Sequence, residues 1–364
     1  MYAILLNVIF TMIISFCLTP IVRWVSIKVG AVDEPNSRRI NTVTMPSSGG
    51  IAIYSAYFFS TFFLLPIDHQ DLWPVFIGAT IVVLTGLVDD IKNISPLMKI
   101  IGLLLAALVI YYMGGIRASM IEIPFIGGVD LGVFSLPLTI LWILGITNAV
   151  NLIDGLDGLA SGVSAISLVT MGIIAYFFLI SNNVGVSMMI FTLVAAILGF
   201  LPFNYYPAKI YLGDTGALFL GFMISVLSLY GLKNVTFITF IIPIVILGVP
   251  ITDTLYAIIR RKLDKRPISS ADNQHIHHRL MALGFSHKQS VKIIYTLTFV
   301  FSLISLLYPV ASTLSSILIT LSLILALQLL AEMIGLVGIK NQPLLNTLRK
   351  MGRKLNRKKT PKDD

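Results

Sequence analysis

A run of polar residues with a three-residue repeat occupies positions 148–160, where NAVNLIDGLDGLA follows a long apolar stretch. The repeat consists of Asn148, Asn151, Asp154 and Asp157. A three-residue step falls about 60° short of a full helical turn, so a helix would fan these side chains along one wall of a cavity. Gly155 and Gly158 leave the backbone bare beside the carboxylates, which suits a helix end that faces a phosphate. A helix cap followed by a solvated loop explains one such pair, but not four polar groups in register.

Two further acidic motifs also border apolar stretches. Asp89 and Asp90 are adjacent carboxylates that repel each other, and a cation, a proton or Lys99 would relieve this repulsion. The second motif is the Gly-Asp-Thr-Gly sequence around Asp214, which a helix cap would also explain. Asn204 and Tyr211 precede Asp214 in the same loop. We therefore expect a polar site assembled from several loops.

Histidines are concentrated in one charged segment near residue 280. His275, His277 and His278 are followed directly by Arg279, and this cluster suits a phosphate or a metal. Zinc is the alternative, but nearby cysteines are absent and the spacing fits neither a helical His-x-x-x-His pair nor a finger. Asp253 lies in the preceding apolar run, where an ionisable group is a functional candidate.

The donor types in these loops are carboxylate and amide oxygens, without cysteine. Such ligands favour a hard cation such as Mg²⁺, which usually shares its coordination shell with substrate phosphates. A Gly-x-x-x-x-Gly-Lys-Ser/Thr loop is absent from the sequence, so side chains and metal must hold any phosphate. We therefore expect a diphosphate substrate, with lysine, arginine and histidine stabilising the leaving group.

The elements that position these residues are expected to be transmembrane helices. Hydrophobic residues make up 56% of the 364 residues and charged residues only 12%, which is too apolar for an ordinary soluble protein. The sequence predicts an all-α integral membrane protein with about eleven spans. These lie at 3–22, 48–66, 73–88, 96–114, 133–150, 159–181, 186–203, 212–230, 235–258, 292–310 and 313–332.

The first span, the single cysteine and the tail indicate how the chain is organised. The first span has neither a basic flank nor a small-residue cleavage site, so we expect a retained helix and not a removed signal peptide. Cys17 is the single cysteine, which excludes a disulfide within the chain. We expect one membrane domain over residues 1–335, followed by a basic cytoplasmic tail over residues 336–364.

The distribution of positive charge predicts the orientation. All but two of the 26 basic residues flank alternate spans or lie in the tail, and the exceptions are Arg117 and Lys233. This places the N-terminus outside, the C-terminus in the cytoplasm and the site in the cytoplasmic loops. The net charge of +9 is explained by orientation and anionic lipid, so nucleic acid is not an expected partner.

Two connections are predicted individually. The first cytoplasmic loop carries Arg38 and Arg39, which could hold phosphate or act only as a topology signal. The outer segment between Gly114 and Gly132, with its glycine pairs and alternating SMIEIPFI sequence, predicts a short hairpin without chemistry.

The motifs taken together resemble those of the polyprenyl-phosphate N-acetylhexosamine-1-phosphate transferases. The resemblance extends from the DEPN-S-R loop to the last cytoplasmic loop, and its motifs are VDDIKNISPLMK, TNAVNLIDGLDGLASG, FNYYPAKIYLGDTG and HIHHRL. It implies transfer of a sugar-1-phosphate from a UDP-sugar to undecaprenyl phosphate, with release of UMP. It also implies Mg²⁺ as the cofactor, with Mn²⁺ as an alternative.

The resemblance implies a role for each matching residue. Asp89 would deprotonate or position the lipid phosphate, with Asp90 beside it and Lys99 on the phosphates; His277 and His278 complete the catalytic set. Asp214 and Asn151 would lie at the metal. The remaining matches are expected near the nucleotide, diphosphate and sugar, with the tyrosine stacked on uracil: Asn148, Asp154, Asp157, Asn204, Tyr211, His275 and Arg279. The first loop departs from the family pattern, since it reads Arg39-Ile40-Asn41.

The histidine loop resembles that of the N-acetylglucosamine enzymes, which initiate teichoic acid or other envelope glycans. The expected partners are UDP-N-acetylglucosamine, undecaprenyl phosphate and the lipid bilayer, with a homodimer as an alternative to a monomer. Three other functions stay open. The first is phospho-N-acetylmuramoyl-pentapeptide transfer, for which the histidine loop would carry a proline before three consecutive histidines. The second is membrane transport, in which the acids would form a cation pathway, and the third is a membrane scaffold, which would leave the acidic motifs unexplained.

Overall fold

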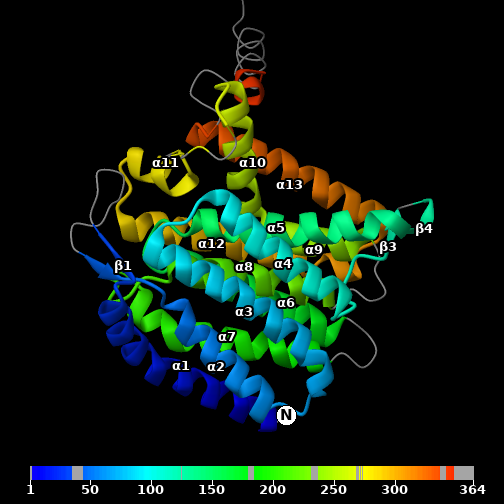
Figure 1. Ribbon diagram of the computed structural model, residues 1–364. Coiled ribbons are helices and arrows are strands. Elements are labelled where there is room, and N and C mark those ends of the chain that lie inside the picture. Colours follow the sequence, from blue (N-terminus) through cyan, green and yellow to red (C-terminus); the bar gives the residue numbers. More distant parts are fainter. Residues whose placement is uncertain are drawn as a thin grey trace, which may run out of the picture. The chain divides into compact units, whose positions relative to one another are not determined.

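The computed structural model describes residues 2–34, 44–123, 125–178, 184–230, 237–267, 270, 272, 274–336 and 342–347. The described chain is mostly helical (Figure 1). It divides into two compact units, each of which is treated by itself below. The first unit comprises Met1–Ile251 and Val291–Val310, and the second comprises Thr252–Ser290 and Ala311–Asp364.

The first unit contains most of the long helices and all four short strands. Its elements are α1 (Tyr2–Val29), β1 (Val32–Asp33), β2 (Met45–Pro46), α2 (Gly50–Phe63), α3 (His69–Lys92), α4 (Pro96–Tyr112), β3 (Met120–Ile123), β4 (Gly127–Asp130), η1 (Gly132–Phe134), α5 (Ser135–Ile153), α6 (Leu159–Phe177), α7 (Val184–Asn204), α8 (Gly213–Tyr230), α9 (Phe237–Ile246) and η2 (Tyr308–Val310). Two helices cross the boundary between the units: α10 (Gly248–Leu263) and α12 (His287–Ser305). The second unit holds α11 (Ile276–Ala282) and α13 (Thr313–Ile334).

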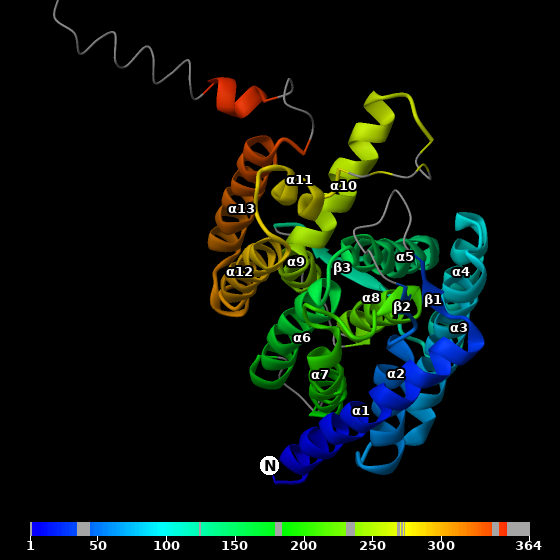
Figure 2. The same cartoon turned by 90° about the vertical axis from the view of Figure 1, so that its left-hand side faces the viewer.

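Helix α8 is the centre of the first unit. It packs against α5, α3, α2 and α6, and every residue from Thr215 to Leu229 is buried (Figure 1). An outer layer forms around it, in which α1 packs on α2 and α7, and α6 packs on α7 (Figure 2). The apolar sequence of α8 is therefore surrounded by helices, whereas α1 exposes apolar side chains such as Leu5, Phe10 and Trp24. Exposed apolar surface of this kind suits a lipid environment.

Glycines allow the closest helix contacts at the start of α8. A Cβ atom on Gly50 would lie 2.1 Å from the Cα of Gly216, and one on Gly86 would lie 2.5 Å from the Cα of Thr215. Only residues without a side chain permit backbones to approach this closely. Helices α2 and α3 therefore press directly on the first turn of α8.

Eight of the described helices are long and apolar enough to cross a membrane, or nine if the bent pair α9–α10 is one span. Helices α2 and α4 are shorter apolar helices. Each apolar run expected from the sequence overlaps a described apolar helix, and the chain is a helical integral membrane protein. The number of crossings and their orientation stay predictions.

The predicted hairpin of the outer segment is confirmed, since β3 pairs antiparallel with β4 and Ile123 lies opposite Gly127. Strands β1 and β2 form a second small antiparallel pair at the base of the first loop. The first-loop residues Arg38, Arg39, Ile40 and Asn41 lie outside the described residues. The expected boundary at residue 335, between one membrane domain and a basic tail, stays a prediction.

Candidate active site

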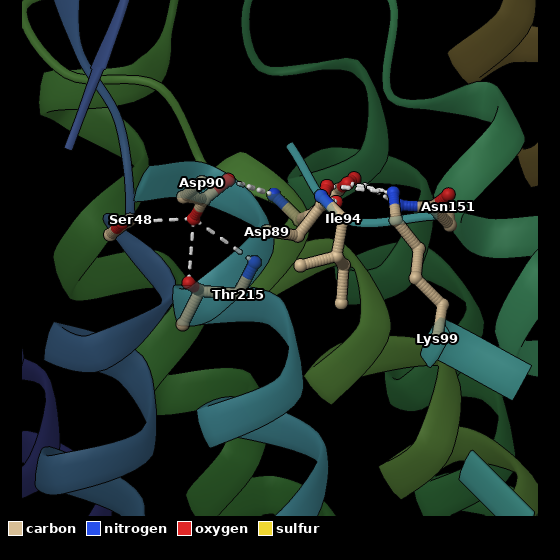
Figure 3. A network of polar contacts seen from close by, with 8 residues as sticks. Ser48, Asp89, Asp90, Ile94, Lys99, Asn151 and Thr215 are labelled. Carbon is tan, nitrogen blue, oxygen red and sulfur yellow. Dashed lines mark hydrogen bonds and ion pairs between the residues drawn. The ribbon is translucent and has the colours of Figure 1, made fainter. Parts of the chain in front are cut away.

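The end of α3 and the starts of α4 and α8 bring two acidic residues together around Lys99. Its ammonium lies 2.7 Å from Asp89 Oδ2, at the end of α3, and 2.5 Å from Asp214 Oδ2, at the start of α8 (Figure 3). Ser95 caps α4 and Pro96 occupies its first turn, so this helix begins where Lys99 can reach both carboxylates. Lys99 therefore forms an ion pair with each of these two carboxylates.

Asn151 joins this cluster from the last turn of α5. Its Nδ2 donates to Asp214 Oδ1 at 2.6 Å, while the backbone N–H of Ile94 donates to Asp89 Oδ1 at 2.9 Å (Figure 3). The predicted metal pair of Asp214 and Asn151 is thus in direct contact. In this arrangement Asn151 is a hydrogen-bond donor, whereas a metal ligand would present its oxygen.

Asp90 has different surroundings from Asp89, although the two are adjacent. Its Oδ1 accepts from the backbone N–H of Asp214 at 2.8 Å. Its Oδ2 accepts from Ser48 Oγ at 2.8 Å and from Thr215 Oγ1 at 2.6 Å (Figure 3). Asp90 therefore acts as the N-terminal cap of α8, supplied by another helix.

Asp154 lies just beyond the end of α5, within the electrostatic reach of the cluster. Burial raises the pKa of the Asp154 carboxyl well above its usual range, and the negative charges of Asp214, Asp90 and Asp157 raise the pKa further. Carboxylates so arranged favour the binding of a cation. The polar repeat identified in the sequence thus contributes both Asn151 and Asp154 to one place.

Other residues hold the loop that follows Asp154. Asp157 Oδ2 accepts from the backbone N–H of Ala208 at 2.9 Å, and the hydroxyl of Tyr295 donates to the carbonyl of Gly158. A Cβ on Gly162 would lie 2.0 Å from the Tyr295 hydroxyl oxygen, so the glycine makes room for this clamp. Asp157 therefore has a structural partner in this arrangement, and its predicted substrate contact is untested.

Three further predicted substrate contacts are also bonded within the protein. Asn204 is buried, accepts from Ser161 Oγ at 2.8 Å and donates to the carbonyl of Ile210 at 3.1 Å. Asn148 donates to the carbonyl of Leu144 in its own helix at 2.7 Å. Tyr211 is partly buried; its backbone N–H donates to the carbonyl of Pro46, and its carbonyl accepts from the backbone N–H of Gly49. Their roles toward a substrate stay predictions.

The histidine loop belongs to the second unit, where Asp253 organises it. Asp253 Oδ2 lies 2.9 Å from His275 Nδ1, and Asp253 Oδ1 accepts from the backbone N–H of Ile276 at 2.9 Å. His277 is buried, and Arg279 donates from Nη2 to Gln274 Oε1 at 2.7 Å. The predicted cluster of histidines and arginine is therefore compact within its own unit.

The cluster around Lys99 and Asp214 offers oxygen ligands that suit Mg²⁺ when substrate phosphates complete the coordination shell. Groups of three or more His, Cys, Asp or Glu side chains that could hold a metal ion are not found among the described residues. Mg²⁺ is commonly bound by only one or two carboxylates together with waters and substrate phosphates. The oxygen donors of Asp214, Asp154 and Asn151 suit that pattern, and the Lys99 ammonium already shows that positive charge is accommodated between the carboxylates.

Several supporting residues escaped the sequence reasoning. Thr215 and Ser48 hydrogen bond Asp90, and both lie in short motifs that a closer analysis of capping residues could have singled out. Tyr295 lies 137 residues from its partner Gly158, inside an apolar helix without any local signal. Only the packing of helices reveals such a contact.

Comparison with known proteins assigns the chain to a family. The model of glycosyl transferase family 4 matches residues 72–232, which include the clusters around Asp89, Asn151 and Asp214. A probable undecaprenyl-phosphate N-acetylglucosaminyl 1-phosphate transferase of Bacillus subtilis is 41% identical over 94% of this chain and 95% of its own length.

More distant relatives extend the comparison. A decaprenyl-phosphate N-acetylglucosaminephosphotransferase of Mycobacterium tuberculosis is 32% identical over 78% of this chain and 77% of its own length. A phospho-N-acetylmuramoyl-pentapeptide-transferase of Borrelia hermsii is 30% identical over 75% of this chain and 84% of its own length.

The helical membrane fold and these relatives together show the class of protein, which is a membrane-embedded transferase. The chain belongs to glycosyl transferase family 4, among the polyprenyl-phosphate N-acetylhexosamine-1-phosphate transferases, as its motifs indicated. It is a multi-pass protein of the bacterial inner membrane.

Proposed function

We propose that the protein transfers N-acetylglucosamine-1-phosphate from UDP-N-acetylglucosamine to undecaprenyl phosphate and releases UMP. The observation that supports this most directly is the cluster of Asp89, Lys99, Asp214 and Asn151 in a chain 41% identical to the Bacillus subtilis relative. The donor and acceptor are inferred from the names of the relatives. The product would start a teichoic acid or another envelope glycan.

Lys99 and Asp89 have complementary tasks in this proposal. The Lys99 ammonium can exchange its two carboxylate partners for phosphate oxygens of the substrates, which brings two anions together. Asp89 can accept the proton of a protonated lipid phosphate or hold that phosphate through a shared proton. Asp90 already accepts several hydrogen bonds, so we assign it to holding α8 and not to proton transfer.

We propose direct attack by the lipid phosphate. An oxygen of this phosphate forms a bond to the β-phosphorus of the UDP-sugar, the bond between the β-phosphorus and the bridging oxygen breaks, and UMP leaves with the bridging oxygen on its α-phosphate. A phosphate monoester is a competent nucleophile once it is oriented, so a covalent intermediate on an aspartate is unnecessary. A burst of UMP without lipid acceptor would contradict direct attack.

Mg²⁺, with Mn²⁺ as an alternative, is the proposed cofactor. Asp214 and Asp154 would hold the ion, and Asn151 would join them by turning its oxygen inward. When bound, Mg²⁺ would neutralise charge on the diphosphate. Asp214 also forms an ion pair with Lys99, so the residues proposed for the ion and for the phosphates are in contact.

The test is UMP release by purified protein with undecaprenyl phosphate and Mg²⁺. UDP-N-acetylglucosamine and UDP-N-acetylmuramoyl-pentapeptide are offered separately, with Asp214→Ala and EDTA as controls. We expect turnover of the first donor alone, with a loss of at least about a thousandfold in both controls. Turnover of the pentapeptide donor would move the protein to that branch, and an absence of UMP from either donor would refute the proposed reaction.

A further inference from the structure

Asp253 is an acidic residue on α10 whose contacts all serve the histidine loop. Only 2% of its surface is exposed, and both of its oxygens are engaged. One oxygen lies 2.9 Å from His275 Nδ1 and the other accepts from the backbone N–H of Ile276 at 2.9 Å. The carboxylate therefore ties the first turn of α11 and the first histidine of the loop to α10.

These contacts determine where the proton of His275 lies. An ionised carboxylate only accepts hydrogen bonds, so the His275 nitrogen that faces Asp253 must be the one that carries hydrogen. Nδ1 is thus the nitrogen that carries hydrogen toward Asp253, and Nε2 is the nitrogen on the other side of the ring. An aspartate that holds one ring nitrogen in this way selects both the tautomer and the orientation of the imidazole.

The orientation of His275 extends to the next two histidines. The rings of His275 and His277 are nearly parallel, with an interplanar angle of 8° and centroids 6.0 Å apart. The rings of His277 and His278 have centroids 4.1 Å apart. Because His275 is the ring of the three that bonds Asp253, it is the fixed member against which the other two are arranged.

His277 contributes a buried ring nitrogen to this arrangement. Its Nδ1 is buried and has no hydrogen-bond partner among the described residues. Burial lowers the pKa of His277 to about 3, assisted by the neighbouring His278, His275 and His287, so the ring stays neutral near pH 7. A buried polar atom without a partner is costly, and such atoms often mark places where a ligand binds.

We propose that Asp253 is the positioning residue of the histidine loop: it fixes His275 as the Nδ1–H tautomer and so sets the histidines that act on the phosphosugar donor. The proposal rests on the proposed function and adds a residue to it. Asp253 itself touches neither substrate in this scheme, because its oxygens are already occupied.

Asp253→Asn tests this role directly, because asparagine keeps the shape of the side chain and replaces one acceptor oxygen by a donor nitrogen. The asparagine oxygen can still accept from Ile276 N–H, which leaves the amide nitrogen facing His275 Nδ1. That nitrogen donates, so the ring must become the Nε2–H tautomer. Nitrogen-15 NMR of histidine-labelled protein in detergent, with His275→Gln used to assign the signal, measures the tautomer without any substrate.

The matched control is Asp272→Asn. Asp272 is another acid of the second unit, ion-paired with Arg260, and it accepts from the backbone N–H of Gln274. Its charge reaches His275 and His278, but among the described residues it is not the partner of the His275 ring, which bonds Asp253. Replacing it removes a negative charge from the same unit and leaves the contact between Asp253 and His275 intact. We expect Asp253→Asn to change the His275 tautomer and to lower kcat about 10–100-fold, with KM for the UDP-sugar changed less than about threefold. We expect Asp272→Asn to leave the His275 tautomer unchanged and to lower kcat less than Asp253→Asn does.

Asp253→Glu is the conservative variant, which restores the charge and the acceptor. Partial return of the Nδ1–H signal and of kcat supports the proposal. An unchanged His275 tautomer in Asp253→Asn, or an equal loss of kcat in Asp272→Asn, overturns it. If Asp253→Asn does not fold, an Nε2–H tautomer in the wild-type protein overturns the proposal. Wild-type protein that releases no UMP refutes the proposed function, while the NMR result still decides the role of Asp253.

Discussion

At the scale of single residues, the two neighbouring aspartates at the end of α3 differ in what they contact. Asp90 bonds the backbone and side chain at the start of α8, and Asp89 faces Lys99. Consecutive helical residues point about 100° apart, so one side chain reaches the next helix and the other reaches the cluster. A sequence with two adjacent acids therefore encodes one cap and one candidate for proton transfer.

Neutral variants of these two acids separate the roles. We expect Asp90→Asn to lower the thermal stability in detergent, because it weakens a helix cap that contributes about 1–2 kcal/mol. We expect Asp89→Asn to stay folded while UMP release falls at least about a hundredfold. Thermal unfolding and UMP release are measured for both variants in parallel. Equal melting temperatures for the two variants would contradict the assignment of Asp90 as the cap.

Asp154 gives a prediction with a defined pH dependence. Its pKa is raised in the folded protein, so the folded state binds a proton more tightly than the unfolded state does. Stability from this group is complete below the ordinary aspartate pKa of about 4 and is lost as the pH rises through the raised pKa. Asp154→Asn should therefore raise the melting temperature of metal-free protein at pH 7.5, and this gain should shrink toward pH 4.

The Asp154→Asn variant also tests the cation site. Mg²⁺ should raise the melting temperature of the wild-type protein, because it relieves the repulsion among the carboxylates. The variant should show a smaller shift and a loss of UMP release. The predicted pH dependence of stability would be contradicted by a variant that is more stable than the wild-type protein at pH 4 but equally stable at pH 7.5.

At the scale of elements, the first turn of α8 is held by glycines of two other helices. Gly50 on α2 and Gly86 on α3 place those backbones against Thr215 and Gly216. Asp214 lies in this turn, so its position depends on how closely the helices approach. Glycine is needed at these places because a Cβ would occupy the space of the opposing backbone.

Gly86→Ala tests this contact, with Gly145→Ala as its matched control. A Cβ at position 86 would lie 2.5 Å from the backbone of α8, whereas one at position 145 would meet no atom within 4 Å. We expect the first variant to lose at least about tenfold in UMP release and to melt at a lower temperature. The control should keep wild-type activity and stability, because alanine is a better helix former than glycine. Similar behaviour of the two variants would refute the close-packing argument.

At the scale of the whole molecule, charge distribution predicts how the chain crosses the membrane. The hairpin between α4 and α5 carries few charges and exposes Phe125, while the segment after α10 is strongly basic. Basic segments remain in the cytoplasm, so the hairpin is predicted to face the outside. The single cysteine makes this prediction accessible to chemical labelling.

Labelling should distinguish the two sides. In a Cys17→Ser background, we expect Phe125→Cys to react with a membrane-impermeant maleimide added to intact spheroplasts. We expect Lys265→Cys to react only after the membrane is opened. Gel-shift or fluorescence detection of the purified chain measures both reactions. The reverse pattern would place the N-terminus inside and would contradict the assignment of a cytoplasmic active site.

The sequence by itself determined the class of molecule and the chemistry of its loops. Apolar runs of membrane length, basic flanks and short acidic motifs are local features, and each is legible without any knowledge of packing. The apolar helices and the outer hairpin followed from such patterns.

Only the tertiary structure decided which acidic residue does what. Asp90 and Thr215 are 125 residues apart, Lys99 and Asp214 are 115 apart, and Tyr295 and Gly158 are 137 apart. The predicted substrate contacts Asn204 and Asp157 turned out to have partners inside the protein, and Asp253 turned out to hold His275. Helical periodicity specifies which face a side chain occupies, but its partner depends on which helix packs against that face, and close packing is set by the whole chain.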